Sequence, residues 1–406
     1  MRRTILGSGL LSLLALLCLN TTTSAQDVGV TATEVKIGNA EPYSGSASAY
    51  GACGTGLSAY FKKINDQGGI NGRKINFITY DSAYSPPRMV EVTRRLVEQD
   101  HVLAMVGSIG TPTNTAIWKY MNTQQVPQLF VLTGATKWGD PKGHPWTMGW
   151  LPTYQSEGRV YAQYVLDNVP NAKIGILYQN DDYGKDYVVG FKDVLAAAGR
   201  SNLIVKEQTY ETTDPTIDSQ IVNLKNSGAN VFLDITIPKY ASQAIKKAYE
   251  IGWHPLHFLN SVSNSANVVL KPAGIEASKG LITIEYVIDP ADPRYANDPG
   301  FKEYAATIQK YEPRGNPYDQ LVVWGYSVAQ TFAQVLKQCG NDVTRKNLMR
   351  QAANLHDLHL PLLLPGITIN TSPTDFYPIK QVYLAKFDGT RWVLFGHLYD
   401  TSKMHR

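Results

Sequence analysis

The sequence predicts an α/β protein with two lobes, each built on a mostly parallel sheet. Strand-like and helix-like segments alternate regularly over residues 35–149. The alternation restarts after the stretch at 146–158 and continues to about residue 283. Such alternation favours parallel strands with helices on both faces of the sheet. The remaining residues form no third unit of this kind, so we expect both lobes to share them, with the chain crossing between lobes more than once.

In the first half, the spacing at 55–65 predicts a helix with four apolar residues on one face, Leu57, Tyr60, Phe61 and Ile64. Ser85 followed by two prolines marks the start of another helix, since the first helical turn tolerates proline. The other segments of this half are expected as strands at 34–40, 74–80, 102–107 and 126–134 and a helix at 113–125.

The second half repeats this pattern. Helices are expected at 156–168, 183–199, 214–228 and 239–252, and strands at 172–179, 202–210, 230–236 and 256–262. Beyond it, residues 280–287 are expected as a strand, and 321–340 and 344–355 as helices. Alternating apolar residues around Asp388-Gly389 predict a C-terminal β-hairpin over 379–396.

The N-terminus predicts export. A basic start is followed by an apolar run from Ile5 to Leu19 and by small residues that favour cleavage after Ala25. Leu17 before Cys18 argues against a lipoprotein signal, and the apolar run is too short to span a membrane. We therefore expect residues 1–25 to be a signal peptide and the mature chain to be periplasmic.

Composition narrows the function further. The formal net charge is only +4, which argues against nucleic-acid binding. Cys53 and Cys339 are the two cysteines of the expected mature chain. Export permits a disulfide, but spacing alone leaves bridge and free thiols equally open.

No pattern of catalytic residues is found. The sequence lacks a G-x-S-x-G elbow, an H-E-x-x-H or C-x-x-C motif and a P-loop, and "GACGTG" at 51–56 departs from the dinucleotide fingerprint. Two histidine pairs, His254/His257 and His356/His359, are expected to be solvated or capping groups. We expect a protein that is not an enzyme and uses no cofactor or metal.

Two loops after strands are suited to bind an anion. The stretch "GSIGTPT" (107–113, turn I) places Thr111 and Thr113 at the start of a helix, and "TGATKWGD" (133–140, turn II) offers Thr133, Ala135 and Thr136. Helix N-termini expose unpaired N–H groups, and ligands of α/β sheets gather at the carboxyl ends of strands. The nearby aromatic residues Tyr43, Tyr50, Trp150 and Tyr183 favour an apolar or aromatic ligand.

Several stretches together resemble a known family. "VKIGNAEPYSGSASAYG", "AYFKKINDQGGINGRKI", "YDSAYSPPRMVEVTRRLVEQD", "GSIGTPTNTA" and "LYQNDDYGKD" are similar to the substrate-binding proteins of branched-chain amino-acid ABC transporters, the type I periplasmic binding proteins. The resemblance runs from about Val35 to Gly396. It implies two Rossmann-like lobes joined by three crossings near Trp150, Thr283 and Pro365. Lobe I would then be residues 26–149 and 284–358, and lobe II residues 150–283 and 359–406.

The resemblance also implies roles for individual residues. Thr111 matches the residue that binds the ligand carboxylate, assisted by Ala135 and Thr136. Tyr50 matches an aromatic residue lining the pocket on lobe I, and Tyr183 and Thr236 would face it from lobe II. Together with Thr113, Ser261 and Val262, these residues are the expected ligand-binding set.

One departure from the family bears on the ligand. Amino-acid binders carry an acidic residue in lobe II that pairs with the ligand ammonium, but "FLNSVSNSAN" (258–267) has none and offers Ser261, Val262 and Ser263 instead. Burying an unpaired ammonium costs several kcal/mol. We therefore expect a carboxylate without an α-amino group, aromatic or apolar, such as a benzoate or a phenylpropenoate-like acid. Asp181 is the alternative ammonium partner.

The leading hypothesis is a monomeric periplasmic receptor that closes on its ligand and delivers it to an inner-membrane ABC permease. A branched-chain or aromatic amino-acid receptor and a ligand sensor for a signalling partner are alternatives within the same fold. An exported hydrolase using Asp181, Asp182 or a histidine is the alternative from another class of protein.

Overall fold

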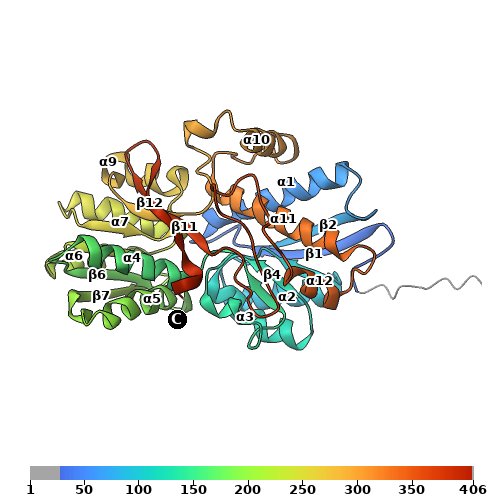
Figure 1. Ribbon diagram of the computed structural model, residues 1–406, viewed down its shortest axis with the longest axis horizontal. Helices are drawn as coiled ribbons and strands as arrows, with labels where there is room; N and C mark the ends of the chain where they lie inside the picture. Colours follow the sequence, from blue (N-terminus) through green and yellow to red (C-terminus); the bar gives the residue numbers. More distant parts are fainter. Residues whose placement is uncertain (1–27, 405–406) are drawn as a thin grey trace, which may run out of the picture.

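The computed structural model describes residues 28–404 and places two α/β lobes side by side (Figure 1). One sheet has five strands and the other has seven. The predicted α/β class, with two lobes on mainly parallel sheets, is confirmed. The predicted signal peptide, residues 1–25, lies outside the described residues.

Lobe I contains the sheet of order β2-β1-β3-β4-β5, in which every pair is parallel. Its strands are β1 (Glu34–Glu41), β2 (Lys74–Asp81), β3 (Ala104–Val106), β4 (Gln128–Val131) and β5 (Thr147–Gly149). Its helices are α1 (Ala52–Asp66), α2 (Pro86–Arg94), α3 (Thr111–Thr123), α10 (Pro299–Tyr311), α11 (Gln320–Cys339) and α12 (Arg345–Ala352). Every residue of β3 and β4 is buried, as expected for strands covered by helices on both faces.

Lobe II contains the sheet of order β12-β11-β10-β9-β8-β6-β7. Its strands are β6 (Ile174–Gln179), β7 (Ile204–Tyr210), β8 (Val231–Ile235), β9 (Leu256–Leu259), β10 (Ile282–Glu285), β11 (Gln381–Phe387) and β12 (Trp392–Asp400). Its helices are α4 (Tyr154–Asn168), α5 (Asp182–Ala197), α6 (Asp218–Asn226), α7 (Pro238–Glu250), α8 (Lys271–Ala273) and α9 (Ile275–Ser278). The strands β10, β11 and β12 pair antiparallel, and the hairpin between β11 and β12 turns at Gly389, whose φ is +104°.

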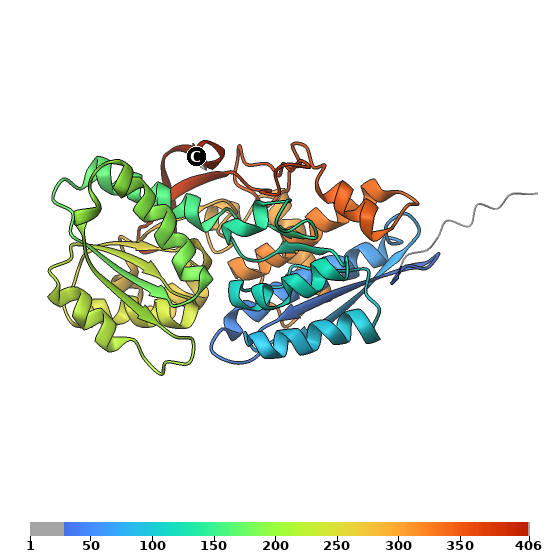
Figure 2. The same ribbon diagram turned by 90° about the horizontal axis from the view of Figure 1, so that it is seen from below.

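The connections between the lobes lie close together (Figure 2). The chain passes from β5 in lobe I to α4 in lobe II through Trp150. After β10, Val287 pairs with Leu363, so two of the connecting segments run side by side. Further along, the Phe376 N–H donates to the Gly139 carbonyl of lobe I at 3.2 Å. The lobe boundaries given above stay a prediction.

Glycines allow two helices to cross closely in each lobe. In lobe II, a Cβ on Gly158 of α4 would lie 2.4 Å from the Tyr187 carbonyl oxygen of α5. A Cβ on Gly190 of α5 would lie 2.1 Å from the Gln155 carbonyl oxygen of α4. In lobe I, a Cβ on Gly325 of α11 would lie 1.8 Å from the Cys53 carbonyl oxygen of α1. Larger residues would push these helices apart, and α4 and α5 carry much of the site described below.

Some features of the described part of the chain bear on the sequence predictions. Cys53 and Cys339 are buried free thiols. Among residues 28–404, no helix is long and apolar enough for a membrane span.

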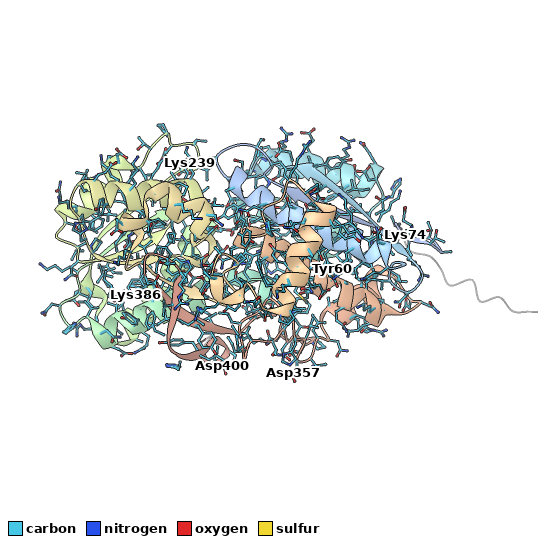
Figure 3. The ribbon with its side chains drawn as sticks, turned by 90° about the horizontal axis from the view of Figure 1, so that it is seen from above. Tyr60, Lys74, Lys239, Asp357, Lys386 and Asp400 are labelled. Atoms are coloured by element: carbon cyan, nitrogen blue, oxygen red, sulfur yellow. The ribbon has the colours of Figure 1, made fainter. Side chains whose placement is uncertain are left out.

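In Figure 3 the labelled Tyr60 and Lys74 lie on lobe I, and Lys239 and Lys386 on lobe II.

Candidate functional site

A small cavity lies between the lobes, and the space between its lining atoms is about 260 Å³, including its opening to solvent. We call it the interlobe cavity. Its described lining residues are all uncharged, and five of the twelve are aromatic. They are Tyr50, Tyr84, Ile109, Gly110, Thr111, Leu132, Leu151, Tyr154, Tyr183, Ile237, Val262 and Trp324.

Most of these residues follow the carboxyl ends of strands. Gly110 and Thr111 follow β3, Tyr183 lies in the first turn of α5 after β6, and Val262 follows β9. β1 lies between β2 and β3, and β6 lies between β7 and β8, so the chain leaves these two strands toward opposite sides in successive connections. Such a switch in strand order opens a crevice at the carboxyl ends of the strands. The fold therefore brings two such crevices together at the cavity.

Thr111 of turn I and Thr133, the first residue of turn II, place a pair of hydroxyls beside the cavity. Thr111 is the first residue of α3 and lines the cavity, and its Oγ1 lies 2.6 Å from Thr133 Oγ1. Gly110 precedes it with a φ of +102°, a conformation that favours glycine. Thr113 does not line the cavity, because its Oγ1 donates to the Ile109 carbonyl at 2.8 Å and holds the turn.

A tyrosine of lobe II reaches the same point. Burial raises the pKa of Tyr154, while hydrogen bonds with the Thr133 side chain, the Gly134 N–H and the Thr111 side chain act in the opposite direction. The Tyr154 N–H also donates to the Gly134 carbonyl at 2.8 Å. The hydroxyls of Thr111 and Thr133, the Gly134 N–H and the Tyr154 phenol thus meet where turn I and the start of turn II come together.

Turn II binds a carboxylate of the protein itself. Thr136 donates from both its N–H and its Oγ1 to Asp186 Oδ2 of α5, each at 2.8 Å, and Gln155 Nε2 donates to Asp186 Oδ1 at 2.8 Å. Burial raises the pKa of Asp186, and these hydrogen bonds lower it. Ala135 is buried in the same turn, with its N–H on Thr133 Oγ1 at 3.2 Å. Ala135 and Thr136 are not among the cavity-lining residues.

Two further contacts join the lobes near the cavity. The Tyr50 hydroxyl, from lobe I, donates to the Val262 carbonyl of lobe II at 3.1 Å. At the edge of turn II, Lys137 Nζ lies 2.8 Å from Asp182 Oδ2 of α5. Together with the bonds of Thr136 to Asp186, these contacts join the two lobes around the cavity.

The residues expected after β8 and β9 divide into two groups. Val262 lines the cavity, whereas Thr236 and Ser261 bind buried acids instead. Thr236 Oγ1 donates to Asp234 Oδ1 at 2.6 Å, and His257 Nε2 lies 3.1 Å from Asp234 Oδ2. This buried pair joins β8 to β9, so His257 is not the solvated or capping group expected from the sequence.

Glu157 of α4 is the acid that Ser261 binds, and sequence reasoning missed it. Its Oε1 accepts from the Ser261 N–H and the Tyr161 hydroxyl, each at 2.7 Å. Its Oε2 accepts from the Ser261 hydroxyl at 2.6 Å and the Tyr187 hydroxyl at 2.9 Å. Burial raises the pKa of Glu157 to about 7, against the effect of these bonds. A carboxylate accepts about four hydrogen bonds, so Glu157 has none left for a ligand.

Asp181, the alternative ammonium partner, is also occupied. Its Oδ1 caps α5 by accepting from the N–H groups of Tyr183 and Gly184, and its Oδ2 accepts from Gln179 Nε2 at 2.5 Å. It does not line the cavity. In the described part of the chain, no group of three or more His, Cys, Asp or Glu side chains is arranged to hold a metal ion.

Sequence reasoning named four of the cavity-lining residues, Tyr50, Thr111, Tyr183 and Val262, and missed the rest. Tyr84 follows β2 in "YDSAYSPP" with a φ of +56°, so its loop position was a usable signal. Tyr154 comes directly after the first crossing. Trp324 gave no signal, because α11 is buried almost throughout and one aromatic residue within it looks like core.

Comparisons with known proteins agree with this geometry. A family model described as periplasmic binding protein matches residues 34–391. The Leu/Ile/Val-binding protein homolog 1 of Brucella suis is 24% identical over 322 residues, which cover 76% of this chain and 80% of that protein.

Two solved structures share the fold. A branched chain amino acid ABC transporter from Thermus thermophilus with bound valine has a TM-score of 0.82 at 14% identity, covering 93% of this chain and 100% of that one. A solute binding protein of an ABC transporter from R. palustris, in complex with benzoate, has a TM-score of 0.74 at 21% identity, covering 89% and 96%. Because the family model spans most of the sequence, the chain belongs to the periplasmic binding protein family, as a type I solute-binding protein of the branched-chain amino-acid transporter type.

Proposed function

We propose that this chain is a periplasmic receptor for a small aromatic or apolar carboxylate without an α-amino group, which it delivers to an inner-membrane ABC permease. The observation that carries the proposal is the lining of the interlobe cavity, in which the described residues offer neutral hydrogen-bond donors and aromatic rings but no acid. The proposal needs no cofactor and treats the receptor as a monomer.

The carboxylate end of the ligand lies at turn I. The start of α3 carries a partial positive charge and N–H groups without helical partners, which favour an anion. Thr111, Thr133 and Tyr154 add hydroxyl groups at the same point. Hydrogen bonds from neutral donors to a carboxylate are stronger than those between neutral groups, so no arginine or lysine is required.

The body of the ligand lies among the rings of Tyr50, Tyr84 and Trp324 and the side chains of Leu132 and Ile237. The space between the lining atoms is small, about 260 Å³ including its opening to solvent, which favours a small ligand. Aromatic rings pack well against such walls.

An α-ammonium group finds no acidic partner among the described residues that line this cavity. Glu157, Asp181 and Asp186 are nearby acids of lobe II, and hydrogen bonds from protein groups occupy all three. A ligand ammonium would lose its hydration without a compensating anion, at a cost of several kcal/mol. The R. palustris structure holds benzoate and the T. thermophilus structure holds valine, so both kinds of ligand occur in this fold.

Closure of the lobes couples binding to delivery. Only the closed form brings the Tyr50 hydroxyl to Val262 and Thr136 to Asp186, so a ligand between the lobes favours that form. The closed surface is then what a permease recognises.

A thermal-shift screen of the mature protein tests the proposal. One panel contains amino acids such as leucine, valine and phenylalanine, and the other contains benzoate, cinnamate and short aliphatic acids. A ligand that binds only the native state raises the Tm by mass action. We expect a rise with the aromatic acids and none with leucine. A rise with leucine or phenylalanine alone would show that an acid of lobe II pairs with an ammonium after all.

A further inference from the structure

Two polar groups of the interlobe cavity have no hydrogen-bond partner. The Tyr183 hydroxyl and the Trp324 Nε1 are both buried, and both residues line the cavity. Buried polar groups in native proteins are nearly always paired, so an unpaired group in a ligand cavity points to the ligand as its partner. Tyr183 belongs to lobe II and Trp324 to lobe I.

The Tyr183 ring cannot turn away to find a partner inside the protein. It packs edge-on against Tyr154, with ring centres 5.3 Å apart, and against Tyr187 at 5.7 Å. The backbone N–H of Tyr183 is fixed by Asp181 Oδ1 at 2.9 Å. The α4–α5 packing therefore fixes the ring of Tyr183, a residue that lines the cavity.

The other hydroxyl groups of the described cavity lining are all matched. Tyr50 donates to the Val262 carbonyl, and Thr111 pairs with Thr133. Tyr84 forms a hydrogen bond with the Gln179 side chain, and Tyr154 bonds at turn I. The Tyr183 hydroxyl is therefore the one unpaired hydroxyl of the described lining, beside the unpaired Trp324 Nε1.

We infer that the ligand is an oxygenated aromatic acid, with a ring hydroxyl or alkoxy oxygen that accepts a hydrogen bond from Tyr183 while the carboxylate lies at turn I. This inference rests on the proposed function and narrows its ligand class. Trp324 Nε1 is a donor only, so it too calls for an oxygen acceptor rather than hydrocarbon. A ligand held by both turn I and Tyr183 contacts both lobes, which links recognition of the ring oxygen to closure.

Such a site discriminates against an aromatic acid whose ring carries no oxygen. An acid without the ring oxygen would leave the Tyr183 hydroxyl buried and unpaired in the complex, and polar sites reject analogues that leave their groups unmatched. We expect the oxygenated acid to bind at least tenfold more tightly than a hydrocarbon analogue of equal size.

Isothermal titration with size-matched acids tests the inference. The probes are 3- and 4-hydroxybenzoate and 4-methoxybenzoate, compared with benzoate and 4-methylbenzoate. They are titrated into the wild-type protein, Tyr183→Phe and the control Tyr304→Phe. Tyr304 also has a buried, unpaired hydroxyl, but it lies in α10 and does not line the cavity.

We expect at least one oxygenated acid to bind tenfold or more tightly than its hydrocarbon match in the wild type and in Tyr304→Phe. In Tyr183→Phe this preference should fall below about threefold, with benzoate affinity nearly unchanged. Equal affinities for the two classes in the wild type would overturn the inference and leave the proposed function intact, and this comparison needs no variant. A preference that persists in Tyr183→Phe would also overturn it. If no aromatic acid binds while an amino acid does, the proposed function itself fails.

Discussion

Turn I and turn II follow neighbouring strands of lobe I, and each presents glycine and threonine before a helical segment. Their uses in the structure differ. Turn I leaves Thr111 beside the interlobe cavity. Turn II already holds a carboxylate, that of Asp186, reached from α5 of the opposite lobe.

The comparison shows that the residues of each turn determine whether it can bind an anion. The residues that face it from lobe II determine which anion it binds. Both turns offer N–H and hydroxyl donors, and the sequence alone ranks them alike. Because Asp186 binds turn II, this turn forms a contact between the lobes. Because uncharged aromatic rings face turn I, that turn stays available for a ligand. The predictions below test this division, from the largest expected effect to the smallest.

Thr111→Val should weaken ligand binding at least tenfold without unfolding the protein. The substitution removes a hydrogen bond to a charged group, worth about 1.5–3 kcal/mol, and keeps the side-chain volume. The measurement is titration of an acid that scored in the thermal-shift screen. Thr307→Val, which removes a buried hydroxyl of α10 bonded to the Glu303 carbonyl, is the matched control and should keep wild-type affinity. Unchanged affinity in Thr111→Val would place the ligand carboxylate away from turn I.

Glu157 is a buried carboxylate held within lobe II alone, and it should make stability depend on pH. Burial raises the pKa of Glu157 from 4.5 in the unfolded chain to about 7, so the folded state binds its proton more tightly. The stabilisation is complete below about pH 4.5 and is lost as the pH rises through about 7, with a total change of about 3 kcal/mol.

Denaturant unfolding at pH 5 and pH 7.5 measures this change. Burial also raises the pKa of Asp289 and of Asp319 to about 6, so both add to the slope in the same direction. The variant Glu157→Gln isolates the contribution of Glu157. Its free energy of unfolding should be lower than that of the wild type at pH 5 and should change less between pH 5 and pH 7.5. A variant with the wild-type slope would mean that Glu157 titrates as an ordinary carboxyl.

Asp186→Ala should weaken ligand binding three- to tenfold, although Asp186 does not line the cavity. The closed form loses the bonds from Thr136 and Gln155, while in the open form water satisfies the same groups, so the net loss is about 1 kcal/mol. Asp193→Ala on the exposed face of α5, where Asp193 pairs with Arg159, is the control. Small-angle scattering without ligand should show a larger radius of gyration in Asp186→Ala only. Equal radius and affinity in both variants would remove Asp186 from the closure contacts.

The sequence predicts features that are local and leaves out those that join distant segments. The alternating periods of apolar residues predict both sheets, and the strand–turn–helix pattern locates Thr111. The partner of Thr136, by contrast, is Asp186, fifty positions away. Glu157 reaches Ser261 across 104 positions, so the absence of an acid at 258–267 did not mean that none was near. Trp324 faces the cavity from a helix whose pattern indicates only burial.

Lys137→Met should have the smallest effect, at most about twofold on ligand affinity. Lys137 pairs with Asp182 at the edge of turn II, where their side chains are 27% and 58% exposed, and ion pairs in water are worth little. Because salt screens such pairs, the difference between wild type and variant should vanish between 0.05 M and 0.5 M sodium chloride. Titration at both salt concentrations measures it, with Lys246→Met, whose exposed pair with Glu250 lies within α7, as the control. A tenfold loss that persists in high salt would mean that turn II contributes charge directly to the ligand, and the division between the two turns would fail.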